Sequence, residues 1–183
     1  PLDLTLELFD IYRTTAAEEG YEPTSRRAAV ALGNAMDIDI EAMEAGQELH
    51  AYEVLEQHTK IITFEPHLHA PGERMCLEAI WGYNVETLSC VGYDHNWVRG
   101  YAYEDGYQPL LPKGTVIAVK SWWDNTSANR ANPDPNQWVG WGDRTVDEMG
   151  HAWVNVTYMD DDDFAAAVAE REARAQTTDA GGQ

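Results

Sequence analysis

Residues 64–75, with the sequence FEPHLHAPGERM, lead from a β-prone segment into a tight turn and carry two histidines, His67 and His69. Side chains at positions i and i+2 of a strand point to the same face, roughly 6.6 Å apart along the backbone. Two imidazoles at this spacing can bind one metal ion through bonds of about 2 Å. The residues that follow, 70–73, predict a turn with Pro71 at its second position and Gly72 at its third. The stretch therefore predicts half of a metal site at the end of a strand.

A second stretch, residues 147–151 with the sequence DEMGH, offers the remaining ligand. The thioether of Met149 is a soft donor that favours Cu(I), whereas imidazole binds copper in both common oxidation states. Zinc sites are built from cysteine, histidine and carboxylate ligands rather than thioethers. His67, His69 and Met149, with one coordination position left open, therefore suit a copper ion that cycles between oxidation states and meets oxygen.

His151 leaves three interpretations open. It lies two residues after Met149 and shares its strand face, so it is a possible additional ligand or a partner that orients one. A strand position beside Trp153 suits packing equally well. A site of three histidines, made by His67, His69 and His151 around zinc or iron, is the alternative to copper.

The remaining candidates are interpreted as structural. We expect His95 to be a packing residue, and Met75, which lies near a turn, to belong to the core and not to the ligands. Asp147 and Glu148 could orient a ligand imidazole, but carboxylates are exposed by default.

Two cysteines, Cys76 and Cys90, flank a hairpin signal: MCLEAIW and VETLSCV separated by Gly-Tyr-Asn. If the turn centres on Tyr83, Trp81 faces Val85 and Cys76 faces Cys90. Directly opposed residues have Cβ atoms about 4.5–5.5 Å apart, close enough for a disulfide after a small adjustment. The alternative is a pair of reduced, buried cysteines. A disulfide would indicate an extracytoplasmic location, whether periplasmic, cell-surface or secreted.

Bulk composition excludes some classes of function. The 183 residues suit one domain, and the chain begins at Pro1, which suggests a processed or excised segment. No uninterrupted apolar run reaches the roughly 18 residues of a transmembrane segment. The net charge of −20 repels phosphate backbones, so nucleic acid is not an expected partner.

About ten short β-prone segments separated by turn formers predict an all-β fold, an antiparallel sandwich or barrel. The first would span residues 2–12, where leucines alternate with polar residues. Only residues 161–175 are predicted to be helical, with the acidic run 160–163 capping the start. We expect a single domain over residues 1–160, the helix over 161–175, and a loose tail over 176–183.

Several motifs occur together, in the order HLHAPGERM, YDHNW, PLLPKGT, DNTSAN, NPDPNQW and DEM, with MCLEAIW continuing the first. In these motifs the chain resembles the C-terminal copper domain of the copper type II, ascorbate-dependent monooxygenases. Peptidylglycine α-hydroxylating monooxygenase and dopamine β-monooxygenase belong to this family, and the resemblance is stronger to bacterial proteins that carry the domain. It covers roughly residues 35–165.

The resemblance implies a jelly-roll β-sandwich with one copper per chain, held by His67, His69 and Met149. It also implies hydroxylation of a substrate C–H bond by dioxygen, with electrons from ascorbate. In the family a preceding domain with a second, histidine-bound copper delivers those electrons. Residues 1–60 contain only His50 and His58, so a partner copper domain or another subunit would be needed. The alternative is a structural or interaction module of the same fold, with copper structural or absent.

Overall fold

The computed structural model describes residues 27–33 and 38–180, so the strand expected at residues 2–12 lies outside the described part. Within these residues, eleven strands and one helix follow one another. They are β1 (Arg27–Gly33), β2 (Asp39–Ile40), β3 (Gln47–Val54), β4 (His58–Leu68), β5 (Gly72–Trp81), β6 (Asn84–Gly92), β7 (Tyr101–Ala102), β8 (Leu110–Leu111), β9 (Val116–Trp123), β10 (Val139–Gly140), β11 (Gly150–Met159) and α2 (Asp161–Ala180).

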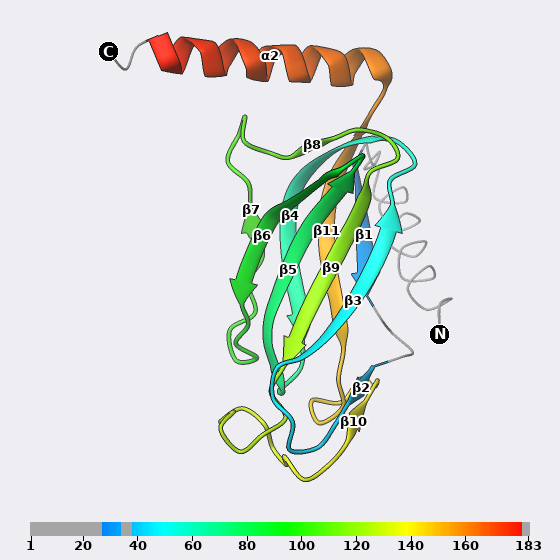
Figure 1. The fold of residues 1–183 in the computed structure, drawn as a ribbon, viewed down its shortest axis with the longest axis vertical. Helices are drawn as coiled ribbons and strands as arrows, with labels where there is room; N and C mark the ends of the chain where they lie inside the picture. The colour runs from blue at the N-terminus through cyan, green and yellow to red at the C-terminus, as the bar shows by residue number, and fades with distance from the viewer. Residues whose placement is uncertain (1–26, 34–37, 181–183) are drawn as a thin grey trace, which may run out of the picture.

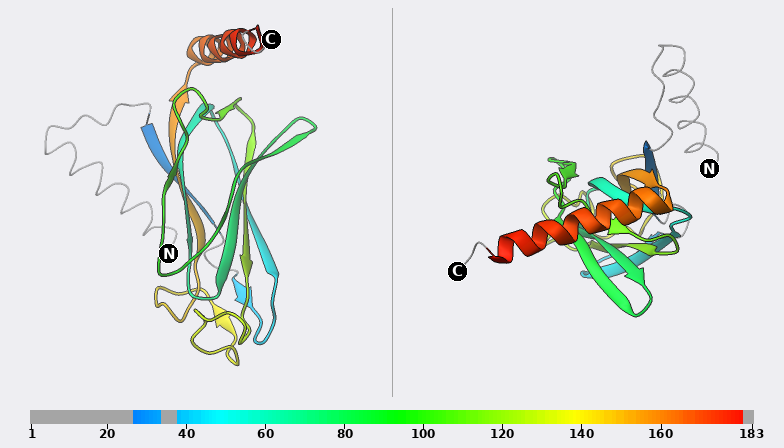
Figure 2. Two further views of the ribbon diagram at one scale, coloured as in Figure 1. Left: turned by 90° about the vertical axis from the view of Figure 1, so that its left-hand side faces the viewer. Right: turned by 90° about the horizontal axis from the view of Figure 1, so that it is seen from above.

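Two antiparallel sheets pack face to face, as Figure 1 and the left view of Figure 2 show. One sheet has the order β1-β11-β4-β7, with β8 also pairing with β4, and the other has the order β3-β9-β5-β6. A separate two-stranded sheet, β10-β2, lies at one end. The predicted antiparallel β-sandwich with a C-terminal helix is confirmed.

The strand order is that of a jelly roll. Because β7 and β8 pair with the same edge of β4, they count as one interrupted strand. Numbered from 1 to 8 in chain order, the strands then form one sheet with the order 1-8-3-6 and another with the order 2-7-4-5. Except for the β5–β6 hairpin, successive strands cross between the two sheets, and two interleaved Greek keys give this pattern.

The core lies between the two sheets and is built by inward-facing residues at every second strand position. Phe64 from β4 and Val154 from β11 meet Leu77 from β5 and Val119 from β9, and all four are at most 1% exposed. Met75 is also fully buried in this cluster, as expected for a packing residue.

β4 contains a bulge that changes which face its residues occupy. Thr59 and Ile61 are buried in its first part, and Phe64, Pro66 and Leu68 in its second part, so the alternation shifts by one residue. The pairing with β11 shifts at the same place, between Asn155 and Val156. An unbroken alternation from Ile61 would have turned His67 inward; the bulge places it on the outer face.

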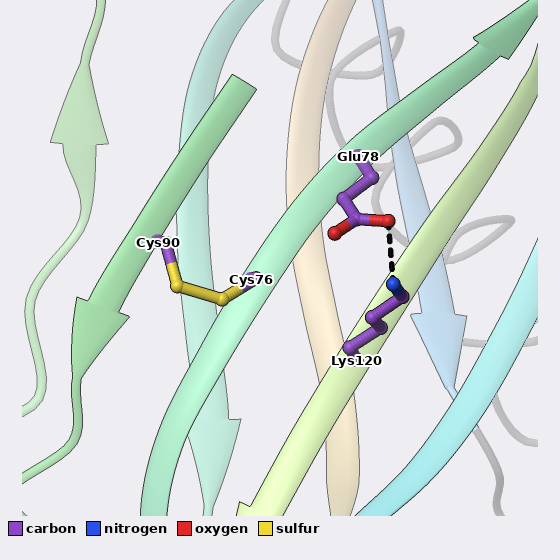
Figure 3. The surroundings of a disulfide bond; sticks show 4 residues. All are labelled: Cys76, Glu78, Cys90 and Lys120. Atoms are coloured by element: carbon purple, nitrogen blue, oxygen red, sulfur yellow. Dashed lines mark ion pairs between the residues drawn. A yellow bond between two sulfur atoms is a disulfide. The ribbon is translucent and has the colours of Figure 1, made fainter. Parts of the chain in front are cut away.

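The hairpin β5–β6 carries the Cys76–Cys90 disulfide, as predicted (Figure 3). The register near the turn differs from the prediction, because Trp81 pairs with Asn84 and Val85 pairs with Ile80. The turn is one residue tighter than expected. A bulge opposite Leu77 and Glu78 restores the register, so Cys76 still faces Cys90.

The disulfide lies on the outer face of its sheet, next to an ion pair between Glu78 and Lys120 with 2.8 Å between Oε2 and Nζ (Figure 3). Lys120 of β9 pairs directly with Cys76, so the two crosslinks tie β9, β5 and β6 together. The hydrogen bond to Glu78 and its charge raise the pKa of Lys120.

The turn after β4 also differs from its prediction. The Gly72 amide donates to the His69 carbonyl at 3.0 Å, so the turn spans 69–72 and begins one residue earlier than expected. Gly72 is not needed for a positive φ. It is needed for space, because a Cβ there would lie 2.4 Å from Cβ of Leu68.

Helix α2 starts at the acidic run, where Asp160 caps the first turn by accepting the Asp163 amide at 2.9 Å. It ends at Ala180, beyond the end at residue 175 that the sequence predicts, so residues 176–180 are helical rather than loose. Figure 1 and the right view of Figure 2 show it lying across one end of the sandwich, where Phe164 stacks on His58 with 4.2 Å between ring centres. Among the described residues, no helix is long and apolar enough to span a membrane.

Candidate metal centre

The predicted ligands gather where β4 ends and β11 begins, on the outer face of the sheet and at the end of the sandwich away from α2 (Figure 1). Antiparallel pairing puts His151 directly opposite His67, and Gly150 opposite Leu68. Residues more than 80 positions apart in sequence are therefore neighbours because of a strand register. We call the four histidines at this place, His67, His69, His95 and His151, the histidine cluster.

His67 and His69 have the spacing that a shared metal ion requires. Their ring centres are 5.4 Å apart and the ring planes meet at 74°. With metal–nitrogen bonds of about 2 Å, two imidazoles on one ion have ring centres roughly 4.5–5.5 Å apart. No three His, Cys, Asp or Glu side chains within residues 27–33 and 38–180 form a ready-made ligand group. A third ligand would therefore come from another residue type, or from an imidazole that turns.

The His69 side chain is anchored so that one nitrogen stays available. Its Nδ1 lies 3.1 Å from the backbone carbonyl oxygen of Asp147. A carbonyl oxygen only accepts, so Nδ1 carries the proton and Nε2 keeps its lone pair. His69 itself is only 6% exposed. The orienting group is thus the carbonyl of Asp147, while the Asp147 carboxylate binds Arg144 with 2.6 Å between Oδ1 and Nη2.

Glu148 is fully buried, contrary to the expectation of an exposed carboxylate. Its Oε1 accepts the backbone amides of both His69 and Met149, the latter at 2.9 Å. Burial raises the pKa of Glu148 to about 8, although these two hydrogen bonds and the Trp123 side chain oppose the shift. One carboxyl group therefore joins the backbones of two predicted ligands from different elements.

Met149 precedes β11 by one residue and is half-buried. The shared contact with Glu148 holds its backbone beside that of His69. The structure thus brings together all four residues that the sequence singled out, His67, His69, Met149 and His151, at one end of the sheet.

His151 stacks on His67, with ring centres 4.6 Å apart and planes 27° from parallel. Burial, followed by the nearby His67 and His69, lowers the pKa of His151 to about 4. Burial, His69 and His95 lower the pKa of His67 in the same way. Both imidazoles are therefore neutral at neutral pH, the form that offers lone pairs to a metal.

His95 also belongs to the histidine cluster, although the sequence analysis interprets it as a packing residue. Its ring centre is 6.0 Å from that of His69, with the ring planes at 72°. The segment between β6 and β7 is held against β4 by Tyr93, whose hydroxyl donates to the carbonyl of Leu68. The only sequence signal was the position of His95 within YDHNW, because the contact to Leu68 spans 25 residues.

A polar hollow of about 410 Å³ opens beside His95. It lies between residues 93–96 and 129–131, with Gly72 at its base. This volume is within the range of small-molecule sites, roughly 300–1,000 Å³. The histidine cluster therefore borders a space that a small molecule can enter.

Comparison with known proteins adds little. No protein-family model matches the chain, and no curated protein matches it. A search of solved structures finds, among others, a chain described as "Structure of infectious bursal disease virus Gt strain", with 8% sequence identity and a TM-score of 0.31. That match covers 75% of this chain and 35% of the viral one.

Proposed function

We propose that this chain is a mononuclear copper-binding domain that resembles the oxygen-activating domain of copper type II, ascorbate-dependent monooxygenases. The observation that supports this proposal most directly is the pair His67 and His69, whose ring centres are 5.4 Å apart. The hydrogen bond of His69 Nδ1 to the Asp147 carbonyl leaves Nε2 free to bind the ion. Met149, held beside His69 through Glu148, supplies the soft donor that favours copper over zinc.

Copper in such a site supplies dioxygen activation and hydroxylation of a substrate C–H bond, with electrons from ascorbate or another reductant. The residues of the chain do the positioning. His67 and His69 would hold the ion on the open face of a sheet, and the Asp147 carbonyl keeps the His69 ring in one orientation. Trp153, two residues beyond His151 on the same face and 37% exposed, gives a substrate an apolar surface to lie against.

Electrons have to come from outside this chain. Of its six histidines, four form the histidine cluster. His50 is on the other sheet, with Nε2 2.5 Å from Glu48, and His58 binds the Lys113 amide at the far end of β4. These two do not form a second copper site, so the proposal includes a second copper domain or another subunit as partner. The disulfide supports an extracytoplasmic location for this chain and its proposed partner.

The test is metal content followed by titration. Protein purified without added metal is loaded with Cu(I) and with Cu(II), and the affinity of each is measured by competition with a chromophoric chelator. We expect about one copper per chain, and Met149→Ala should weaken Cu(I) binding more than Cu(II) binding. Met159→Ala, at the other end of β11, is the matched control. Absence of copper uptake, or Cu(I) affinity unchanged in Met149→Ala, would count against the proposal.

The zinc or iron alternative predicts a different pattern. With His67, His69 and His151 as ligands, Met149→Ala would be silent and His151→Ala would empty the site. His151 stacks on His67 with 4.6 Å between ring centres, so the His151→Ala variant, and not this spacing, decides between the two ligand sets.

A non-catalytic interaction module is the second candidate, favoured by the exposure of Trp97 at 62% and Trp138 at 61%. Copper would then be structural or absent. Chelation separates the two candidates. A melting temperature unchanged by chelator supports the module, whereas a melting temperature that falls indicates an occupied site.

A further inference from the structure

His95 has a buried nitrogen without a partner. Its Nδ1 makes no hydrogen bond within the described part of the chain, although less than 1 Å² of the atom is accessible. Leaving a buried polar atom unpaired destabilises a fold, so such an atom calls for an explanation. An imidazole nitrogen that lacks a proton is also a metal ligand.

Hydrogen bonds hold the backbone around His95, whereas Nδ1 of its ring has no partner among the described residues. Asp94 accepts the Asn96 amide on its side chain at 2.9 Å and the Trp97 amide on its carbonyl at 2.8 Å, forming a turn that presents His95. The Tyr93 amide donates to the Glu73 carbonyl at 2.7 Å, and the Tyr93 hydroxyl donates to Leu68. Leu68 is the residue between His67 and His69, so this contact sets His95 directly beside the predicted pair.

From this placement we infer that His95 is a third imidazole ligand, through Nδ1, of the same copper ion that His67 and His69 hold. The inference rests on the proposed function. His95 forms no hydrogen bond in residues 27–33 and 38–180 that a turn of its ring would break. A rotation of the His95 side chain about its Cα–Cβ bond, together with the ring turn, would bring the ring closer to His69 than the present 6.0 Å between ring centres.

His151 is the competing candidate for this role. Its ring is stacked on His67 and meets Trp153 edge-on, with 5.5 Å between ring centres, so it is already packed on two sides. His95 instead meets His69 at a steep angle and borders the hollow between residues 93–96 and 129–131. A ligand at this position would place the copper at the entrance of the hollow, within reach of a small molecule bound there.

The experiment counts coordinated imidazoles and measures affinity on the full chain. Copper K-edge X-ray absorption of the loaded wild type should show three imidazoles, and His95→Phe should show two. The same variant should keep one copper per chain and bind it at least about tenfold more weakly, because it loses a ligand while keeping an aromatic ring. His50→Phe, the same change on the other sheet, should alter neither the count nor the affinity.

The outcomes separate this inference from the proposed function. No copper uptake by the wild type would overturn both. One copper per chain with two imidazoles in the wild type, or with an unchanged count and affinity in His95→Phe, would overturn the role of His95 alone. If His95→Phe does not fold, the imidazole count of the wild type decides: three imidazoles that remain three in His151→Phe support His95, and a drop to two in that variant assigns the third ligand to His151.

Discussion

At the scale of single residues, the predicted ligands are positioned by groups that are not themselves predicted ligands. Glu148 joins the backbones of His69 and Met149 through one oxygen, and the Asp147 carbonyl holds the His69 ring. Both residues belong to the DEM motif. The motif therefore supplies the predicted ligand Met149 together with the two groups, the Glu148 carboxyl and the Asp147 carbonyl, that position His69.

Replacing Glu148 by Gln should change how stability depends on pH in the metal-free protein. The buried acid keeps its proton up to a pKa of about 8, whereas its usual pKa is 4.5. Between these values the folded state binds more protons than the unfolded state, so the free energy of unfolding falls as pH rises. Glu148→Gln should remove that contribution and keep both backbone hydrogen bonds.

The measurement is urea unfolding of chelator-treated protein at several pH values from about 4.5 to about 8.5, a window that brackets the two pKa values. Exposed Glu73→Gln is the control and should follow the wild type. The lowered pKa values of His67 and His151 contribute equally to every curve, so the difference between variants isolates Glu148. Parallel curves for Glu148→Gln and wild type would show that the residue is ionised when buried.

Gly72→Ala should destabilise the fold by about 1–3 kcal/mol, because the new Cβ overlaps Cβ and Cδ1 of Leu68. Leu68 separates His67 from His69, so copper affinity should fall as well. Gly92→Ala is the matched control, since a Cβ there meets nothing within 4 Å. Thermal unfolding and copper titration of the two variants check the prediction, and equal stability of both would contradict it.

At the scale of elements, bulges decide what the strands present. The bulge in β4 turns His67 outward, and the bulge in the β5–β6 hairpin brings Cys76 opposite Cys90 after a turn that is one residue tight. In both cases one extra residue changes the face or the partner of everything beyond it. The sequence therefore predicts where the strands lie better than it predicts which face of the sheet each residue occupies.

Removing the disulfide should cost about 3 kcal/mol of unfolding free energy, the value expected for a loop closed by residues 14 apart. The double variant Cys76→Ala, Cys90→Ala is compared with wild type in urea, with and without reductant. Reductant should lower the wild type to the level of the variant and leave the variant unchanged. A wild-type unfolding free energy that reductant leaves unchanged would contradict the prediction. A double variant as stable as the wild type would contradict it as well.

At the scale of the whole molecule, the helix α2 and the histidine cluster lie at opposite ends of the sandwich. β4 runs from His58, which stacks on α2, to Leu68 beside the histidine cluster (Figure 1). The helix and the cluster are therefore separated by the length of an 11-residue strand. The net charge of −20 extends over a chain with only twelve basic residues.

Added salt should therefore stabilise the protein. Like charges repel one another across the folded surface, and raising NaCl from about 0.01 M to about 0.15 M shortens the screening length from about 30 Å to about 8 Å. The free energy of unfolding, measured in urea because urea is uncharged, should rise over this range. Equal concentrations of KCl should give the same rise, since screening depends on ionic strength and not on the cation. A flat or falling curve would show that the acidic surface is not self-repelling.

Local sequence predicted the β-prone segments, the disulfide and the i, i+2 pair His67 and His69, whereas the turn after β4 and the turn between β5 and β6 each differ by one residue from their predictions. These predictions rest on patterns that extend over a few residues: alternating apolar and polar residues, Gly and Pro at turns, and the i, i+2 spacing of His67 and His69. The structures they predict are formed by contacts over the same short range. The resemblance in ordered motifs linked DEM to HLH across 78 residues, and strand pairing places them side by side.

The tertiary structure decided that His67 faces outward, that Glu148 is buried and that His95 lies beside His69. The burial of Glu148 and the position of His95 depend on contacts between residues more than 20 positions apart, and the outward face of His67 depends on a one-residue bulge that no local pattern predicts. Burial and register are properties of the whole packed sandwich, because every strand's face is fixed by its partners. The sequence supplied the predicted ligands His67, His69 and Met149, and the fold determined how they are placed and which other imidazoles lie beside them.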